Sequence, residues 1–294
     1  MKKTKDIKNQ FLALCFCFCF VFTSVNAQIK VDESQADISS DTVAKKIVDY
    51  AKYKITYEMR FARDSTVPTK KIVCQTALFI GSKYSWFLDY NAFRQDSVID
   101  ETAKRNENIA SVMAQVIPVG RLVKYNGFVM KNYPSAAQVT FQQKIMSLYY
   151  QYVDKDIDIQ WDLIDEDKEV AGYQCKKAQC SYCGRDYIAW YAPEITISEG
   201  PYVFSGLPGL IMEIGDTKNN FRFTLNGFEQ AKSAYPIYFY TKKVTETTRA
   251  EVRKIEKNSF LDRENALKNS LSSNVTIENM PSLPPRPYNP IELN

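Results

Sequence analysis

The chain has 294 residues, a formal net charge of +4 and no histidine. The lack of histidine excludes Ser–His and Cys–His nucleophile pairs, histidine general bases and most zinc sites. Four of the 38 basic residues and one of the 34 acidic residues lie within positions 1–27. The remainder is therefore close to neutral, which argues against a nucleic-acid-binding surface.

Residues 1–27 have the pattern of a secretory signal peptide. Four lysines between positions 2 and 8 precede an apolar run over 11–25, and Val25-Asn26-Ala27 fits a cleavage site. The apolar run is short for a spanning helix, and no later segment is long and apolar enough to cross a bilayer. We expect an exported protein without a transmembrane segment, located in the periplasm, at the cell surface or in the medium.

Three further regions follow along the chain. Residues 28–46 are polar and acidic and are expected to form a poorly ordered leader, with a short helical turn between Thr42 and Tyr50. Residues 47–279 are expected to form a single β-rich domain, because no Ser/Gly linker or composition break divides them. Residues 280–294 are rich in proline, which cannot continue a helix, and should run extended over the surface.

Alternating hydrophobicity predicts that strands dominate the domain. From Tyr53 to Phe61 apolar and polar residues alternate, as in a strand covered on one face. Further strands are expected at Lys71–Ile80, Ser85–Leu88, Arg121–Lys131, Val139–Tyr149, Ile157–Leu163, Gly172–Gln179, Asp186–Tyr191, Leu210–Ile214, Phe221–Phe228 and Ile237–Lys242. Residues 90–116 and 246–271 have helical spacing. The predicted class is α+β, mainly antiparallel β, with one large curved sheet and a few helices on or beside it.

Four cysteines follow the signal: Cys74, Cys175, Cys180 and Cys183. In an oxidising compartment an even number predicts disulfides. Three pairings are open, and we prefer Cys74–Cys175 with Cys180–Cys183. A redox CxxC site would open a helix, whereas this spacing falls in an expected hairpin turn. A zinc site would need two more soft ligands.

Two runs of carboxylates are candidates for cation binding. Residues 154–158 lack the glycine and terminal glutamate of an EF-hand loop. Residues 165–169 lie between two predicted strands and are most simply a solvated turn. We therefore expect no metal site and no cofactor.

The segment Gly206-Leu207-Pro208-Gly209-Leu210-Ile211 contains no nucleophile, base or metal ligand. The residue before a proline is extended, Pro208 fits the second position of a turn, and Gly209 can supply the positive φ of a type II turn. The residues that follow alternate as in a strand. We interpret the segment as a structural turn, with Leu207 and Leu210 as apolar anchors.

Several motifs follow one another in the order of a known family. They are Gly172–Ala178, Gly184–Tyr191, Gly200-Pro201, the Gly206–Ile211 turn and the terminal Tyr288–Leu293. Together they resemble the GLPGLI family, secreted proteins of Bacteroidota whose biochemical role is not established. The resemblance is tight from Trp161 to Glu229 and loose over the rest. It implies export, but it transfers no catalytic residue.

Aromatic residues are the remaining functional signal, with 19 Tyr, 17 Phe and 3 Trp. Tyr187, Trp190 and Tyr202 lie in dense clusters and are candidate ligand-facing residues. We predict a non-enzymatic binding or accessory module that uses its curved, aromatic-rich sheet to bind a peptide, a lipid or an envelope protein. Two alternatives are a histidine-free hydrolase that uses carboxylates and a purely structural envelope protein.

Overall fold

A computed structural model describes residues 41–155, 157–232, 234–270 and 282–293. The expected signal peptide lies outside these residues. The strands are β1 (Lys45–Tyr50), β2 (Tyr53–Ala62), β3 (Lys71–Ile80), β4 (Ser85–Asp89), β5 (Gly127–Lys131), β6 (Val139–Ile145), β7 (Leu148–Asp154), β8 (Asp162–Val170), β9 (Tyr173–Tyr182), β10 (Arg185–Ala192), β11 (Leu210–Asp216), β12 (Phe221–Gln230), β13 (Pro236–Tyr240) and β14 (Val244–Glu246). The helices are α2 (Tyr90–Lys104), α3 (Ile109–Gly120), α4 (Arg249–Leu261) and α5 (Arg263–Ser270).

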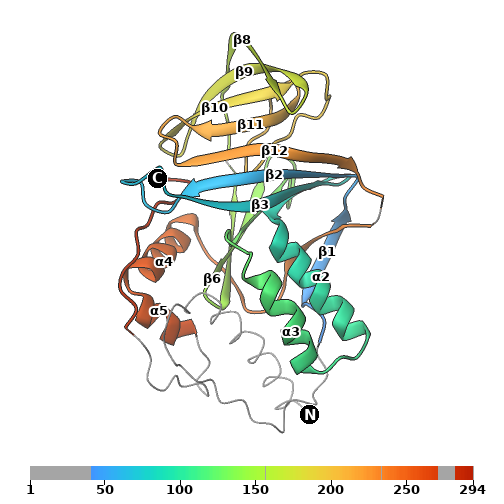
Figure 1. Ribbon diagram of the computed structural model, residues 1–294, viewed down its shortest axis with the longest axis vertical. Coiled ribbons are helices and arrows are strands. Elements are labelled where there is room, and N and C mark those ends of the chain that lie inside the picture. The colour runs from blue at the N-terminus through green and yellow to red at the C-terminus, as the bar shows by residue number, and fades with distance from the viewer. Residues whose placement is uncertain (1–40, 156, 233, 271–281, 294) are drawn as a thin grey trace.

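One sheet of 12 strands dominates the fold, in the order β14-β7-β6-β5-β4-β3-β2-β12-β11-β10-β9-β8, and β1 pairs with β13 beside it. All neighbouring strands are antiparallel except β14 and β7. The predicted mainly antiparallel α+β class is confirmed. Figure 1 shows β8–β12 above β2 and β3, and the two helix pairs below them.

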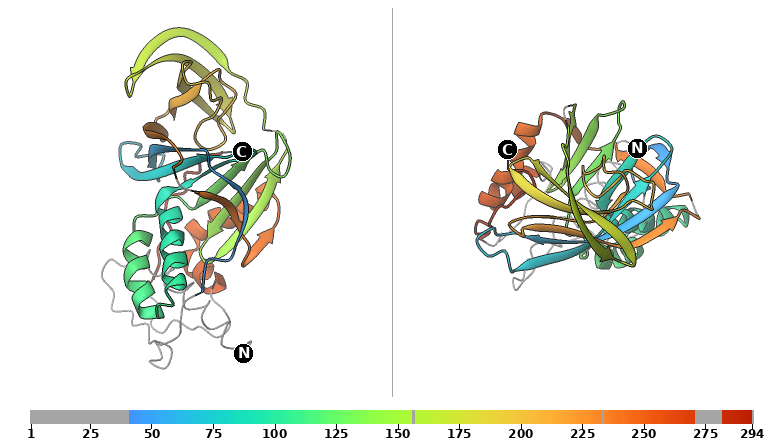
Figure 2. Two further views of the ribbon diagram at one scale, coloured as in Figure 1. Left: turned by 90° about the vertical axis from the view of Figure 1, so that its right-hand side faces the viewer. Right: turned by 90° about the horizontal axis from the view of Figure 1, so that it is seen from above.

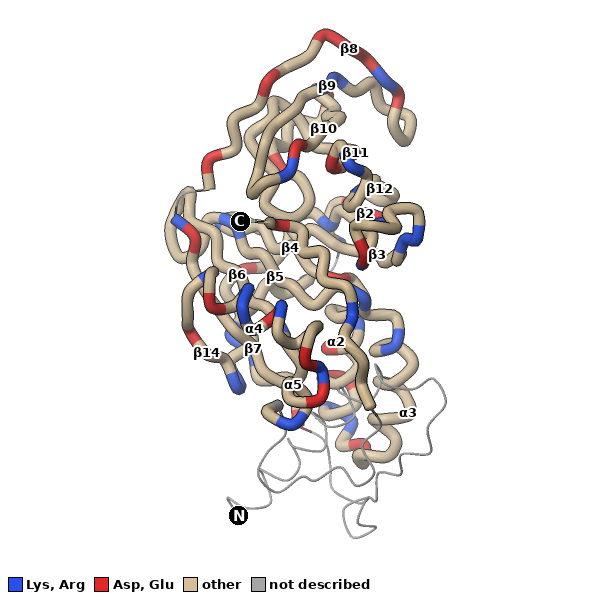
Figure 3. The backbone as a smooth tube through the Cα atoms, turned by 90° about the vertical axis from the view of Figure 1, so that its left-hand side faces the viewer, with Lys and Arg blue, Asp and Glu red and all other residues tan. Residues whose placement is uncertain are grey.

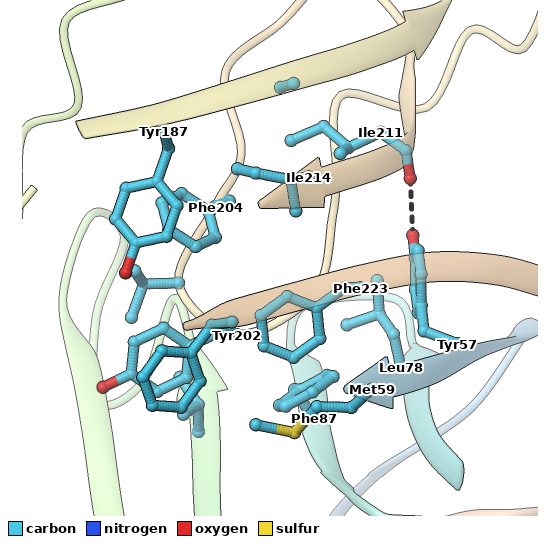
Figure 4. Packing of buried hydrophobic residues seen from close by; sticks show 14 of the residues in the cluster. Tyr57, Met59, Leu78, Phe87, Tyr187, Tyr202, Phe204, Ile211, Ile214 and Phe223 are labelled. Carbon is cyan, nitrogen blue, oxygen red and sulfur yellow. Dashed lines mark hydrogen bonds between the residues drawn. The ribbon is translucent and has the colours of Figure 1, made fainter. Parts of the chain in front are cut away.

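The large sheet curls around one hydrophobic core. Buried residues of β7 near one end and of β9 and β10 near the other belong to the same cluster. In Figure 4 Phe87 of β4 lies against Phe223 of β12, with ring centroids 5.8 Å apart. Figure 2 shows β8 and β9 arching over the end of the molecule opposite the helices. This curvature leaves the concave side facing the interior.

β4 and the second half of β3 are buried on both faces. On β3, Leu78 belongs to the main core, whereas its neighbour Phe79 packs in a second cluster with Trp86 of β4. This second cluster is covered by Phe93 of α2 and by β13. Burial on both faces explains the continuous apolar runs Ala77–Ile80 of β3 and Trp86–Leu88 of β4, which made both strands predictable.

The predicted strand Arg121–Lys131 is wrong in its first half, since β5 begins at Gly127. The amides of Lys124 and Tyr125 donate instead to one carboxylate oxygen of Asp89, at 2.9 and 3.1 Å. The other oxygen of Asp89 caps α2 by accepting from the Asn91 amide. The buried Asp89 side chain therefore accepts hydrogen bonds from the two amides that would otherwise pair with a neighbouring strand.

The predicted strand Val139–Tyr149 is two strands. β6 and β7 form a hairpin that turns at Met146, whose φ is 56°. Left-handed backbone at a methionine is uncommon, so the sequence carried no turn signal there.

The short helical turn expected between Thr42 and Tyr50 is also wrong. Residues 45–50 form β1, which pairs with β13. This pairing joins segments far apart along the chain, since Lys45 lies opposite Tyr240, 195 residues later, and no local sequence pattern predicts it.

The acidic run 165–169, expected as a turn, lies inside β8, which begins at Asp162 rather than at Ile157. Its carboxylates pair with lysines of β9, as in Lys176–Asp167 at 2.7 Å and Lys177–Glu166 at 2.8 Å. β8 is the edge of the sheet, and Figure 3 shows acidic and basic positions along it. Charges at an edge discourage pairing with another chain.

A candidate ligand-binding cavity

A cavity of about 320 Å³ lies between the large sheet, the two helix pairs and the C-terminal segment. Its walls are mainly apolar and come from separate layers: Met59 of β2, Phe141 of β6, Val116 of α3 and Val252 of α4 are examples. The volume falls at the lower end of the range that small-molecule sites occupy. Three carboxylates also line it, and each is held differently.

Asp96 of α2 is the first of these carboxylates and is 6% exposed. Its Oδ2 accepts hydrogen bonds from the hydroxyls of Tyr238, at 2.6 Å, and Tyr240. Burial raises the pKa of Asp96 to about 6, although both tyrosines favour the ionised form. The carboxyl therefore changes charge in the mildly acidic range.

Glu256 of α4 is the second. Its Oε1 accepts from the Gln143 amide at 3.0 Å, and its Oε2 accepts from the Tyr288 hydroxyl at 2.9 Å. Desolvation raises the pKa of Glu256 despite the hydrogen bond from Tyr288. These bonds join β6, α4 and the C-terminal segment along one wall.

Glu292 of the C-terminal segment is the third, and it is 4% exposed. Its Oε1 accepts from the Tyr182 hydroxyl at 2.9 Å and the Tyr202 hydroxyl at 2.5 Å, and its Oε2 accepts from Arg249 at 2.8 Å and from Arg253. Burial alone would raise the pKa of Glu292, but Arg249 and the other partners hold it below its usual value. Glu292 is therefore ionised at neutral pH.

The C-terminal segment was expected to run extended over the surface, and hydrogen bonds hold its last residues against the β9–β10 hairpin. Arg185 donates to the carbonyls of Pro290 and Ile291, at 2.6 and 3.1 Å, and the Leu293 amide donates to the Cys183 carbonyl at 2.8 Å. The segment has no regular secondary structure over 282–293, and of its described residues Glu292 is buried whereas Leu293 is 52% exposed. Prolines prevented a helix there, but they did not prevent docking.

The structure separates the three predicted ligand-facing aromatics. Tyr202 is 4% exposed and lines the cavity, while Tyr187 is 1% exposed and donates to the Ile291 carbonyl at 3.2 Å. Trp190 is half-buried away from the cavity, with the ammonium groups of Lys168 and Lys177 5.3 and 5.8 Å from its ring centroid. Of the three, Tyr202 alone is placed to contact a ligand in this cavity.

The Gly206–Ile211 turn is a core element with a different geometry from the predicted type II turn. The Gly209 amide donates to the Leu207 carbonyl at 2.8 Å, and the Leu210 amide donates to the Ile195 carbonyl at 3.2 Å. This is a three-residue turn centred on Pro208, because the preceding loop takes the amide that a type II turn needs. Leu207 and Leu210 are buried.

Buried polar contacts hold this turn in place. The Tyr57 hydroxyl donates to the Ile211 carbonyl at 2.9 Å, as Figure 4 shows. The Lys131 side chain, 4% exposed, pairs with Glu199 and donates to the Gly200 carbonyl at 2.9 Å. The turn is therefore part of the hydrophobic core, and none of its residues lines the cavity.

The expected disulfides are not formed, and all four cysteines are free thiols. Cys74 lies on β3 and Cys175 on β9, with β2, β12, β11 and β10 between them in the sheet. Cys180 faces the core from β9, whereas Cys183 lies in the following turn and accepts from Arg249. Burial raises the pKa of Cys175 to about 11 and of Cys180 to about 12, which leaves both protonated.

The described residues offer no site for a metal ion and no helical membrane span. They contain no group of three His, Cys, Asp or Glu side chains that could hold a metal ion. No helix within the described ranges is long and apolar enough to span a membrane.

Sequence reasoning missed Asp96, Glu256 and Glu292 as cavity residues. They come from positions 160 and 36 residues apart along the chain, on two helices and a tail. The one sequence signal that could have indicated any of them is the terminal Tyr288–Leu293 motif, which contains Glu292.

Comparisons with known proteins give a short match. Residues 183–213 match the sequence profile of a family described as "Protein of unknown function (Porph_ging)". The match runs from the β9–β10 turn through β10 and the Gly206–Ile211 turn into β11. No curated protein sequence matches the chain.

Two solved structures of PNGF-II are similar to the chain over most of its length. The structure in space group P21 is 12% identical, with a TM-score of 0.46, and the match covers 70% of this chain and 33% of that one. The structure in space group C2 is 13% identical, with a TM-score of 0.47, and covers 71% and 33%. The chain thus spans about a third of the length of the solved structures it matches.

Proposed function

We propose that the chain is an exported, non-enzymatic binding module of the GLPGLI family that holds a small, mainly apolar ligand in its cavity. The observation that carries this proposal is the cavity of about 320 Å³, whose apolar lining comes from the sheet and from both helix pairs. The signal-like start of the chain supports export. The ligand site is therefore proposed inside the curl of the sheet rather than on an exposed face.

The state of the carboxylates supports binding over catalysis. Hydrogen bonds from tyrosines, arginines or a glutamine occupy Oδ2 of Asp96 and both oxygens of Glu256 and Glu292. A catalytic acid or base must reach the substrate with an oxygen. Groups held in this way are better suited to fixing the walls of the cavity.

A hydrolase remains the second candidate because of one observation. Burial raises the pKa of Asp96 and Glu256, whereas arginines lower the pKa of Glu292, and acid–base pairs in enzymes are separated in this way. The test is hydrolysis of chromogenic glycosides at pH 5–7. Turnover that disappears in Glu256→Gln and in Glu292→Gln would favour the hydrolase over the binding module.

The binding proposal is tested by filling the cavity. Ile117 of α3 lines the cavity and is only half-buried. In Ile117→Trp the indole ring can therefore fill the cavity without displacing a fully buried side chain. We expect saturable binding of the neutral dye Nile red to the wild type and at least about tenfold weaker binding to this variant. Leu163→Trp is the control, because Leu163 on edge strand β8 is 61% exposed.

Two outcomes would contradict the binding proposal. One is the absence of saturable dye binding to folded wild-type protein. The other is equal binding to Ile117→Trp and Leu163→Trp. Either result would favour a purely structural envelope protein. If the dye instead binds the wild type and not Ile117→Trp, mass spectrometry of species that co-purify with the wild type would identify the natural ligand class.

A further inference from the structure

Five basic side chains from four separate segments converge beside the ligand cavity. Arg63 follows β2, Arg121 and Lys124 follow α3, Arg263 begins α5, and Arg286 lies in the C-terminal segment. Four of them border a second cavity of about 280 Å³. Its other described lining residues are Ile72, Gly120 and Val123, so none of the described residues around it is acidic.

The arginines of this cluster have no acidic partner among the described residues. None of the ion pairs among the described residues includes Arg63, Arg263 or Arg286. The Arg263 guanidinium donates to the Pro284 carbonyl at 3.2 Å, and the Lys124 ammonium donates to the Arg121 carbonyl. These are neutral acceptors, which leave the positive charge uncompensated.

The acidic residues next in sequence to two of the arginines are used elsewhere. Asp64 accepts from the amide and hydroxyl of Thr66. Asp262 accepts from the backbone and side-chain amides of Asn265, and Glu264 accepts from the Leu283 amide at 3.0 Å. Desolvation and the charge of Arg286 lower the pKa of Arg63. Desolvation and the charges of Arg286 and Arg63 lower the pKa of Arg263. Partly desolvated like charges destabilise one another unless an anion joins them.

The two cavities share part of their lining. Arg63, Lys124 and Arg286 border both, so a ligand can place one end among these charges and the other among the apolar walls. We propose that this basic cluster binds the phosphate head group of an amphiphile whose apolar chain occupies the central cavity. The inference rests on the proposed ligand cavity and adds the chemical class of its ligand.

Phosphate fits the cluster better than carboxylate does. A guanidinium fork binds either group through two parallel hydrogen bonds. A carboxylate carries one charge and two oxygens, so most of the basic groups would stay unpaired. A phosphate monoester carries up to two negative charges and three free oxygens, which matches several cations around one space.

The test uses four probes with wild-type protein in calorimetric titrations: n-octyl phosphate, n-octanoate, n-octanol and inorganic phosphate. We expect octyl phosphate to bind at least about tenfold more tightly than octanol, and more tightly than octanoate. In Arg63→Gln/Arg286→Gln the affinity for octyl phosphate should fall to within about threefold of that for octanol. The affinity for octanol should not change.

Arg105→Gln is the matched control, because Arg105 pairs with Glu107 on the surface at the end of α2, and it should preserve the preference for phosphate. The double variant removes like charges, so its melting temperature should equal or exceed that of the wild type. If that variant does not fold, Arg63→Gln and Arg286→Gln should each lose part of the preference.

The outcomes separate this inference from the proposed function. If octanol does not bind, the apolar cavity fails as a ligand site and this inference fails with it. If octanol binds but phosphate adds no affinity, or the preference persists without Arg63 and Arg286, the head-group site alone is wrong. Equal affinity for inorganic phosphate and octyl phosphate would overturn the proposal that one ligand occupies both cavities.

Discussion

Among single residues, Gly209 of the Gly206–Ile211 turn occupies a position where a side chain would clash with the backbone. Gly209 has a φ of 154°, and a Cβ there would lie 2.3 Å from the Ala192 carbonyl oxygen. Gly172 also has positive φ, at 84°, but a Cβ there would meet nothing within 4 Å. Alanine substitutions at Gly209 and Gly172 therefore separate the cost of a positive φ from the cost of a steric clash with the backbone.

We therefore expect Gly209→Ala to lower the free energy of unfolding by more than about 3 kcal/mol, and Gly172→Ala by about 1 kcal/mol. The difference arises because Gly209→Ala must also displace the backbone at the end of β10. Urea unfolding at pH 7 measures both values. Equal losses would show that the close approach to Ala192 is not what selects glycine in the turn.

The burial of Asp96, also a single side chain, makes the stability of the protein depend on pH. Its pKa is about 6 in the folded protein against 3.8 for an ordinary aspartate. Between these values the folded state binds more protons than the unfolded state, so stability falls as pH rises from about 4 to 6. Above that range the ionised carboxylate destabilises the fold by on the order of 3 kcal/mol.

Asp96→Asn should remove this dependence, because an amide oxygen still accepts from Tyr238 and Tyr240 but carries no charge. We expect the variant to be more stable than the wild type at pH 7 and equally stable near pH 4. Thermal melts across pH 4–8 provide the measurement. A wild-type advantage that grows with pH would show instead that the ionised form stabilises the fold.

At the scale of elements, sequence pattern predicted the strands that local periodicity determines. β2, β3, β4 and β11 are close to their expected bounds, because each is amphipathic or continuously apolar. The helical stretches also form, as α2 with α3 and α4 with α5. β1 and the β6–β7 turn were missed, because distant pairing determines the first and an unusual Met146 conformation the second. β8 was misplaced because its charged, mostly exposed residues lack an apolar alternation, although it pairs with the next strand, β9.

The candidate site was far less predictable than the strands. The basic cluster combines residues from positions 63 to 286, and no stretch of the sequence is strongly basic around any of them. The carboxylates of the cavity were likewise ordinary charged residues of helices and of a proline-rich tail. Tertiary contacts alone bring them together, so composition and spacing could not identify them.

Across the molecule, Glu292 connects distant parts of the fold through its hydrogen bonds and ion pairs. Its partners Tyr182 and Tyr202 belong to β9 and to the loop before β11, while Arg249 and Arg253 belong to α4. One carboxylate thus joins the curled end of the sheet, the helix beside the cavity and the C-terminal segment. Removing its charge would leave two arginines without this partner.

We expect Glu292→Gln to lower the free energy of unfolding at pH 7 by about 3 kcal/mol, because removing one partner of a buried ion pair leaves the other uncompensated. The exposed Glu251, 3.7 Å from Lys254, provides the control, and Glu251→Gln should cost less than about 0.5 kcal/mol. The folded-state pKa of Glu292 is below 4.5, so its contribution is complete above that pH and is lost as pH falls through the folded pKa. Urea unfolding should therefore show the two proteins converging in acid, and a difference independent of pH would contradict the ionic role of Glu292.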